Sequence, residues 1–202
     1  TTVFNLISGL HRPDSGAILF DGARIDGLPP HRITRKGVAR TFQISRDLAG
    51  LSVLENMVVQ SPARGLRHLL QPSMSPAERE RATELLSFVG IAELAQEPAA
   101  RLSYRQKKLL ELAACLMAEP RLVLLDEPAG GINPALLEII IDRVRQLRAQ
   151  GVTFLIVEHN MDVVMNVCDP VVVMAYGKFL AHGSPAAIQN DAAVLEAYLG
   201  VA

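Results

Sequence analysis

An apolar run that ends in two carboxylates and a proline most constrains how this chain can fold. The run reads Leu122-Val123-Leu124-Leu125-Asp126-Glu127-Pro128. Its aliphatic residues do not alternate with polar ones, so the run predicts a short strand buried on both faces, as in a parallel sheet. Because ligands of parallel sheets bind at the carboxyl ends of strands, the acidic pair suits phosphate chemistry. Asp126 can reach a magnesium ion while Glu127 orients or deprotonates a water molecule. The alternative is a buried strand whose acidic end is merely solvated.

The remaining patterns predict an α/β fold. Strand patterns lie at 122–125, 153–157 and 171–174, a possible edge strand lies at 178–181, and helix patterns lie at 134–150 and 161–168. This alternation predicts a parallel sheet with helical crossovers. Helix patterns dominate 44–119, at 51–60, 75–89 and 103–117, whereas the first residues show a helix at 3–10, a hairpin around Asp21-Gly22 and a strand at 37–42. We therefore predict a core from 1–43 and 120–184, a helical subdomain at 44–119 and a helical tail at 185–202.

Composition limits the class of protein. The 202 residues are 50% hydrophobic and 20% charged, which is a globular profile. A formal net charge of −1 offers no basic surface for nucleic acid, so no nucleic-acid partner is expected. Cys115 and Cys168 lack the spacing of a zinc site or a disulfide framework, which fits a reducing compartment. No apolar run approaches the roughly 20 residues that span a bilayer.

Five further segments stand in the order found in the ATP-binding subunits of ABC transporters, and the chain resembles that family over essentially its whole length. The segments are Thr1-Thr2-Val3-Phe4-Asn5-Leu6-Ile7-Ser8-Gly9, Arg40-Thr41-Phe42-Gln43, Leu102-Ser103-Tyr104-Arg105-Gln106, Ala129-Gly130-Gly131-Ile132-Asn133-Pro134 and Val157-Glu158-His159-Asn160-Met161-Asp162. They resemble, in that order, the end of a Walker A motif, the Q-loop, the signature motif, the D-loop and the H-loop. The acidic run resembles Walker B.

The resemblance implies a P-loop NTPase core that binds ATP and Mg²⁺. It implies that Thr1, Gln43 and Asp126 act at the metal, that Thr1 and Thr2 lie beside the nucleotide, and that Glu127, His159 and Gln43 are catalytic. It implies further that Ser103, Arg105 and Gln106 contact the nucleotide of a second subunit, together with Asn133. The helix that begins near Ser103 would direct free backbone N–H groups toward the γ-phosphate.

Each of these residues also has an ordinary structural explanation. Thr1 and Ser103 are good helix N-caps, Gln43 can be a surface polar residue, and His159 can be a solvated residue at the end of a buried strand. The sequence also departs from the family pattern. Arg105 replaces a glycine that allows close approach of the backbone to phosphate, and Asn133 stands where many relatives carry aspartate.

The resemblance extends to a subfamily and its partners. The segments 37–43, 54–56 and 194–200 look like importers of branched-chain amino acids, although amide importers and lipopolysaccharide exporters share some of these features. The implied partners are a second ATP-binding subunit (homo- or heterodimer), transmembrane permease subunits and, indirectly, a periplasmic or extracellular solute-binding protein. The implied location is peripheral, at the cytoplasmic face of the cell membrane.

Two other functions stay open. Since the phosphate-cradling loop and its lysine would precede Thr1, we expect an N-terminally truncated fragment that lacks most of Walker A. A non-hydrolytic, nucleotide-responsive subunit or an inactive fragment is therefore one alternative, which Arg105 also favours. The other is an ABC-type ATPase of DNA repair or translation. That class would carry long heptad insertions or tandem cassettes, and neither is found in the sequence.

Overall fold

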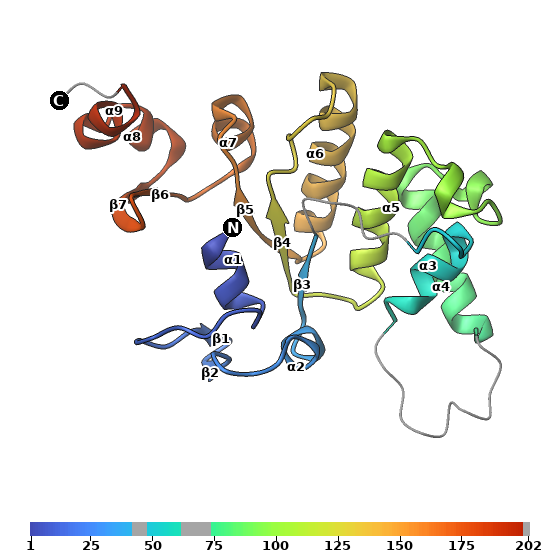
Figure 1. Ribbon diagram of the computed structural model, residues 1–202. Coiled ribbons are helices and arrows are strands. Elements are labelled where there is room, and N and C mark those ends of the chain that lie inside the picture. Colours follow the sequence, from blue (N-terminus) through green and yellow to red (C-terminus); the bar gives the residue numbers. More distant parts are fainter. Residues whose placement is uncertain (42–47, 62–73, 200–202) are drawn as a thin grey trace. The chain divides into compact units, whose positions relative to one another are not determined.

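The structure is a computed structural model that describes residues 1–41, 48–61 and 74–199 (Figure 1). The chain divides into two compact units, Thr1–Val157 and Glu158–Ala202. Across the described ranges, every helix is too short or too polar to pass through a bilayer.

A three-stranded parallel sheet forms the centre of the first unit (Figure 1). Its strands are β3 (Val38–Arg40), β4 (Leu122–Asp126) and β5 (Thr153–Val157), with β4 in the middle. Both neighbours run parallel to β4, and Asp126 pairs in register with Val157. The side chains of Val123 and Leu124 are fully buried, since β4 has a strand on each side and helices over its faces. The predicted parallel sheet with an inaccessible central strand is confirmed.

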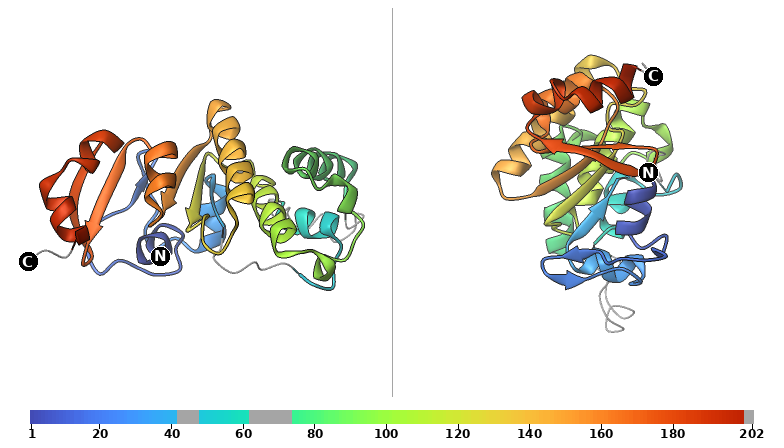
Figure 2. Two further views of the ribbon diagram at one scale, coloured as in Figure 1. Left: turned by 90° about the horizontal axis from the view of Figure 1, so that it is seen from above. Right: turned by 90° about the vertical axis from the view of Figure 1, so that its left-hand side faces the viewer.

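Helices cover both faces of this sheet. On one face, helix α1 (Thr2–Ile7), helix α2 (Pro30–Arg35) and the hairpin of β1 (Leu19–Phe20) and β2 (Ala23–Arg24) surround one apolar cluster. The buried members of the cluster are Phe4, Ile25, Ile33, Val38 and Leu124. Helix α6 (Pro134–Ala149) lies on the other side, as the view from above in Figure 2 shows. The packing of α1 against Leu124 brings the amino end of that helix close to the acidic end of β4.

Three helices pack together in the segment between β3 and β4. They are α3 (Val53–Val59), α4 (Pro76–Val89) and α5 (Tyr104–Leu116), and short 3₁₀ turns at Ala92–Leu94 and Ala99–Arg101 join the last two. Ser52, Ser75 and Ser103 cap the three helices, each in a reciprocal capping box with the third residue of its helix. These bonds satisfy backbone N–H groups that the first helical turn leaves without partners. Ser103, which the sequence indicated as a good N-cap, has that role in the structure.

The second unit is a hairpin with three helices. Its elements are α7 (Met161–Val167), β6 (Val171–Ala175), β7 (Lys178–Gly183), α8 (Pro185–Gln189) and α9 (Ala192–Leu199). Strand β6 pairs antiparallel with β7, which confirms a strand at the expected position 178–181, whereas the membership of 171–174 in the parallel sheet stays a prediction. A short connection explains this antiparallel pairing. Tyr176 and Gly177 both have positive φ, and two such residues form the tight turn that joins antiparallel strands.

Gly9 supports the approach of α1 to the loop before α2. Its φ is +75°, and a Cβ atom there would lie 2.5 Å from the Leu28 carbonyl oxygen and 2.8 Å from Ile33 Cδ1. Gly27 offers a matched control, because its φ is +76° while a Cβ atom would meet nothing within 4 Å. The pair separates backbone strain from steric overlap.

We expect Gly27→Ala to lower the free energy of unfolding by about 1 kcal/mol through its backbone conformation alone. We expect Gly9→Ala to cost about 1–3 kcal/mol more, because a well-packed site must also move to admit the methyl group. Urea denaturation of both variants measures the difference. Equal losses in the two variants would contradict the close approach of α1 to the Leu28 loop.

Candidate nucleotide site

The carboxyl end of β4 carries the predicted acidic pair. The side chain of Asp126 is 1% exposed, whereas Glu127 is half-buried. Glu127 has a φ of +49°, a left-handed conformation that is uncommon outside glycine. Its N–H donates to the Val157 carbonyl at 2.9 Å, and its own carbonyl accepts from the Gly130 N–H at 2.9 Å. The turn therefore places two adjacent acidic residues in different surroundings, one buried and one partly exposed.

Thr1 lies beside Asp126. Its hydroxyl donates to Asp126 Oδ1 at 3.4 Å, a long hydrogen bond between residues 125 positions apart. In the described structure this hydroxyl makes no capping bond to α1, so helix capping does not account for Thr1. Thr2, the first residue of α1, is exposed. The packing of α1 thus brings together Thr1 and Asp126, two of the residues predicted to act at the metal.

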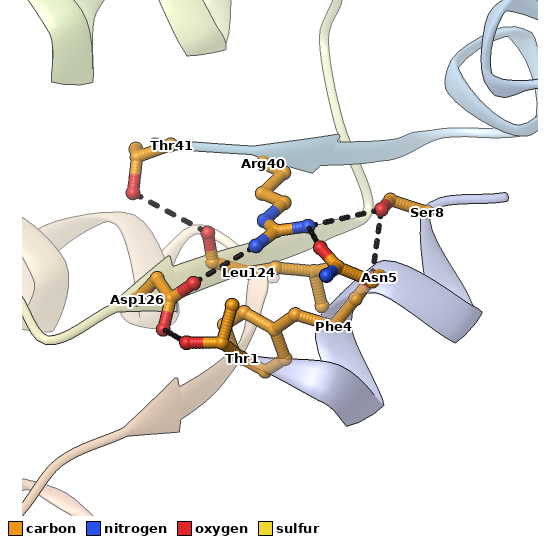
Figure 3. Close-up of polar contacts among 8 residues, drawn as sticks. All are labelled: Thr1, Phe4, Asn5, Ser8, Arg40, Thr41, Leu124 and Asp126. Atoms are coloured by element: carbon orange, nitrogen blue, oxygen red, sulfur yellow. Dashed lines mark hydrogen bonds and ion pairs between the residues drawn. The ribbon is translucent and has the colours of Figure 1, made fainter. Parts of the chain in front are cut away.

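Arg40 is a further residue of this site, to which the sequence analysis assigned no role. It ends β3, and its side chain is 8% exposed. One guanidinium nitrogen, Nη2, lies 2.8 Å from Asp126 Oδ2 (Figure 3). A sequence signal did exist. An arginine at the end of a short apolar strand is a charge that must find a partner if the strand is buried.

The oxygen atoms at this site fit a magnesium ion that is also held by phosphates. In the described part of the chain, no three His, Cys, Asp or Glu side chains gather as a metal cluster. The hydroxyl oxygen of Thr1 and the Oδ1 atom of Asp126 are hard oxygen ligands. Mg²⁺ is usually bound by one or two such groups together with substrate phosphates and water. Because Arg40 occupies Oδ2, the site leaves Oδ1 to face a cation.

The residues of the predicted signature motif begin α5. Ser103 Oγ accepts from the Gln106 N–H at 3.4 Å, while Gln106 Oε1 accepts from both the N–H and the hydroxyl of Ser103. These two side chains thus form the cap of the helix. Arg105, in the first turn, is exposed. The hydroxyl of Tyr104, the first residue of α5, donates to the Gly130 carbonyl at 3.3 Å. Helix α5 therefore contacts the loop that follows the acidic pair.

Asn133 directly precedes α6, and its Oδ1 accepts from the Leu136 N–H at 2.8 Å. This bond is an N-cap, and it holds the end of the loop that starts at Glu127. The Asn133 residue is exposed. Its predicted contact with nucleotide stays a prediction.

The catalytic roles of Gln43 and His159 stay predictions. Gln43 lies outside the described residues. His159 belongs to the second unit, two positions after the end of β5, and is exposed. Glu158 accepts hydrogen bonds from the N–H groups of His159 and Asn160 at 3.0 Å and 3.1 Å and so shapes this turn. The expectation that His159 follows a buried strand is wrong for the described chain. β5 lies at the edge of the three-stranded sheet, and Leu155 is 39% exposed.

A pocket of about 250 Å³ borders the site. Its lining includes Ser8 from α1, Ile33 from α2, Arg40 from β3 and Cys115 from α5. Burial, and secondarily the charge of Glu111, raises the pKa of the Cys115 thiol to about 12. Cys115 is therefore protonated at neutral pH and acts there as a small apolar side chain rather than as a nucleophile.

The arrangement defines a class of protein. A parallel sheet carries two adjacent carboxylates at the end of its central strand. The N-terminal helix α1 brings the Thr1 hydroxyl to Asp126. The helical segment between β3 and β4 contacts the loop after Glu127 through Tyr104. This is the architecture of an α/β nucleotide-binding protein with a helical insertion.

Comparisons with known proteins identify the family. The ABC transporter family matches residues 1–130, and the branched-chain amino acid ATP-binding cassette transporter family matches residues 180–202. The chain is 39% identical over 205 residues to the probable branched-chain amino acid transport ATP-binding protein LivG of Archaeoglobus fulgidus. That match covers 99% of this chain and 80% of LivG. It is also 39% identical over 211 residues to BraF of Pseudomonas aeruginosa, a high-affinity branched-chain amino acid transport ATP-binding protein. That match covers 100% of this chain and 83% of BraF.

A solved structure agrees with these relatives. The crystal structure of the ADP conformation of an ATP-binding cassette of an ABC transporter matches with a TM-score of 0.85 and 32% identity, over 98% of this chain and 82% of that one. The chain belongs to the ABC transporter family. It is an ATPase subunit of an ABC transporter, which confirms the predicted fold class and enzyme class.

Proposed function

We propose that this ATPase subunit drives the import of branched-chain amino acids. The observation that carries the proposal is the similarity, over 99–100% of the chain, to transport ATP-binding proteins named for that class of solute. The match of residues 180–202 to a branched-chain amino acid cassette family supports it independently of the catalytic motifs.

At the acidic end of β4, Thr1 and Asp126 would hold Mg²⁺ next to the phosphates of ATP. When bound, the ion neutralises the negative charge of the phosphates during phosphoryl transfer. Glu127 is half-buried beside this point, so its carboxylate can orient a water molecule. The water oxygen attacks the γ-phosphorus, its proton passes to Glu127, and the bond from the γ-phosphorus to the leaving oxygen of ADP breaks.

Other residues would complete the site. Gln43 is assigned to the metal and the attacking water, His159 to the γ-phosphate, and Thr2 to the nucleotide phosphates. The exposure of His159 and Thr2 supports these roles, because both side chains are accessible to a ligand. The assignment follows the order of motifs in the ABC transporter family.

A second subunit would supply the remaining contacts. In this arrangement two subunits, identical or different, associate head to tail, and Ser103, Arg105 and Gln106 of one contact the ATP of the other. Ser103 and Arg105 are exposed at the beginning of α5, where free N–H groups and the helix dipole favour phosphate. Asn133 would act at the same interface, where it is exposed.

The proposal also gives each part of the chain a place. Residues 1–43 and 120–184 form the ATPase core, 44–119 the helical subdomain that transmits motion to the permease, and 185–202 the helical tail. The subunit would lie peripherally on the cytoplasmic face of the cell membrane. A solute-binding protein outside the membrane would interact with it only indirectly.

Arg105 favours one second candidate, a nucleotide-responsive subunit whose signature motif does not support ATP hydrolysis. The guanidinium stands in the first turn of α5, where a glycine would allow the backbone to approach phosphate. An arginine there can pair with phosphate but restricts that approach.

Reconstitution tests the proposed function. The full-length natural protein is combined in proteoliposomes with its second ATP-binding subunit and with its permease and solute-binding subunits. ATP-dependent uptake of leucine, isoleucine and valine is measured, with lysine as the control solute. We expect magnesium-dependent ATP hydrolysis and uptake of the branched-chain amino acids alone. Hydrolysis with uptake of neither solute class would contradict the proposed substrate. Nucleotide binding without hydrolysis would favour the second candidate.

A further inference from the structure

Arg40 connects the strand β3, the helix α1 and the acidic end of β4. Its Nη2 atom pairs with Asp126 Oδ2 at 2.8 Å, while its Nη1 atom donates to Asn5 Oδ1 at 2.7 Å and to Ser8 Oγ at 3.2 Å (Figure 3). The guanidinium also lies over the ring of Phe4, 5.6 Å from its centroid. One buried side chain therefore holds two elements that are far apart in the sequence.

The contacts on α1 share one face of that helix with Thr1. Thr1, Asn5 and Ser8 are spaced by four and three residues, which places them on the same side of a helical segment. Ser8 Oγ is itself fixed, because it donates to the Phe4 carbonyl at 2.7 Å. The contacts that hold Arg40 to α1 therefore also set where Thr1 lies relative to β4.

The two carboxylate oxygens of Asp126 have different neighbours as a result. Oδ2 accepts from Arg40, and Oδ1 faces the hydroxyl of Thr1 at 3.4 Å. An ion pair on one carboxylate oxygen restricts rotation of the group, and here it leaves Oδ1 beside Thr1. The two arms of the guanidinium separately reach Asp126 and α1, whereas a lysine ammonium is a single point charge and lacks that planar geometry.

We propose that Arg40 is a positioning residue for the Thr1–Asp126 pair, holding Oδ1 and the Thr1 hydroxyl in the relative position at which they bind a divalent cation. The inference rests on the proposed function, in which these two residues hold Mg²⁺. Arg40 acts through Asp126 and α1 and does not itself touch the ion or the nucleotide. Groups that orient metal ligands affect metal affinity even though they bind no metal.

The test compares metal and nucleotide binding by the full-length natural protein and its Arg40→Lys variant. Lysine keeps the positive charge next to Asp126 and therefore limits the damage to folding. The affinity for a fluorescent ADP analogue is measured in EDTA, and the affinity of the protein–ADP complex for Mn²⁺ is measured from the EPR signal of the free ion. We expect Mn²⁺ affinity to fall by about tenfold, with metal-free ADP affinity and the melting temperature nearly unchanged.

Two further variants separate positioning from general stabilisation. Asn5→Ala leaves the ion pair of Arg40 and Asp126 in place and removes one contact on α1, so it should lower Mn²⁺ affinity in the same direction. Arg81→Lys alters a solvent-exposed ion pair with Glu84 on α4 and should leave both affinities unchanged.

Several outcomes would overturn the inference. Unchanged Mn²⁺ affinity in Arg40→Lys would show that Arg40 does not position the pair. An equal fall in Mn²⁺ and metal-free ADP affinity, accompanied by a lower melting temperature, would show a purely structural role. If the wild-type protein itself binds neither ADP nor Mn²⁺, the proposed function fails and the positioning role fails with it. If the wild type binds both, only the result for the variants decides.

Discussion

Glu127→Gln should abolish almost all ATP turnover and leave nucleotide binding intact. Glutamine matches the shape of glutamate and can keep the same backbone turn, in which residue 127 has a φ of +49°. It cannot accept a proton from the attacking water. Because general base catalysis contributes about 10²–10⁴-fold to rates, we expect kcat to fall by at least about a hundredfold. Phosphate release measures turnover, and a fluorescent nucleotide measures binding.

Glu138→Gln is the matched control for this experiment. Glu138 is exposed on α6 and has no assigned role at the site, so the same chemical change there should leave kcat unaltered. A Glu127→Gln protein that folds normally and keeps more than about a tenth of the wild-type turnover would be inconsistent with the role of Glu127 as base. The base would then have to be sought elsewhere.

Asp126→Asn should cause the largest loss of stability among the changes at the site. The side chains of Arg40 and Asp126 are 8% and 1% exposed, so the substitution leaves a buried guanidinium without its counter-charge. Removal of one partner from a buried ion pair costs about 3–5 kcal/mol in the free energy of unfolding. Urea denaturation of the wild type and the variant measures the loss.

A double-mutant cycle shows whether the loss arises from the pair. Arg40→Met in the Asp126→Asn background removes the uncompensated charge, so the double variant should be more stable than the sum of the two single losses predicts. Glu84→Gln, at the solvent-exposed pair of Arg81 and Glu84, is the control and should show no measurable change. Additive losses at Arg40 and Asp126 would mean that the two side chains do not interact energetically.

The central strand and its chemistry were predictable from local sequence. The run 122–125 is apolar without alternation, which favours burial on both faces, and the structure confirms that burial. Helix ends were predictable for the same local reason. Ser75 and Ser103 cap helices through bonds that span three residues. The order of the motifs identified the family, because spacing along the chain requires no knowledge of distances in space.

The pairing of the later strands was not predictable from periodicity alone. A run such as Val171–Ala175 is compatible with either a parallel or an antiparallel neighbour. Its antiparallel pairing with Lys178–Gly183 depends on the two-residue turn at Tyr176 and Gly177. The exposure of Leu155 likewise depends on the position of β5 at a sheet edge, which no residue within the strand specifies.

Residue types and their spacing along the chain therefore determined the buried strand, the acidic pair, the helix caps and the family. The tertiary structure decided which distant groups meet. Thr1 reaches Asp126 across 125 positions, and Arg40 reaches it across 86. Hydrophobic periodicity and capping act over a few residues, whereas these contacts depend on the packing of α1 and on β3 being the neighbour of β4. For that reason the sequence predicted Asp126 as a metal ligand, and only the folded chain revealed Arg40 as the residue that holds it.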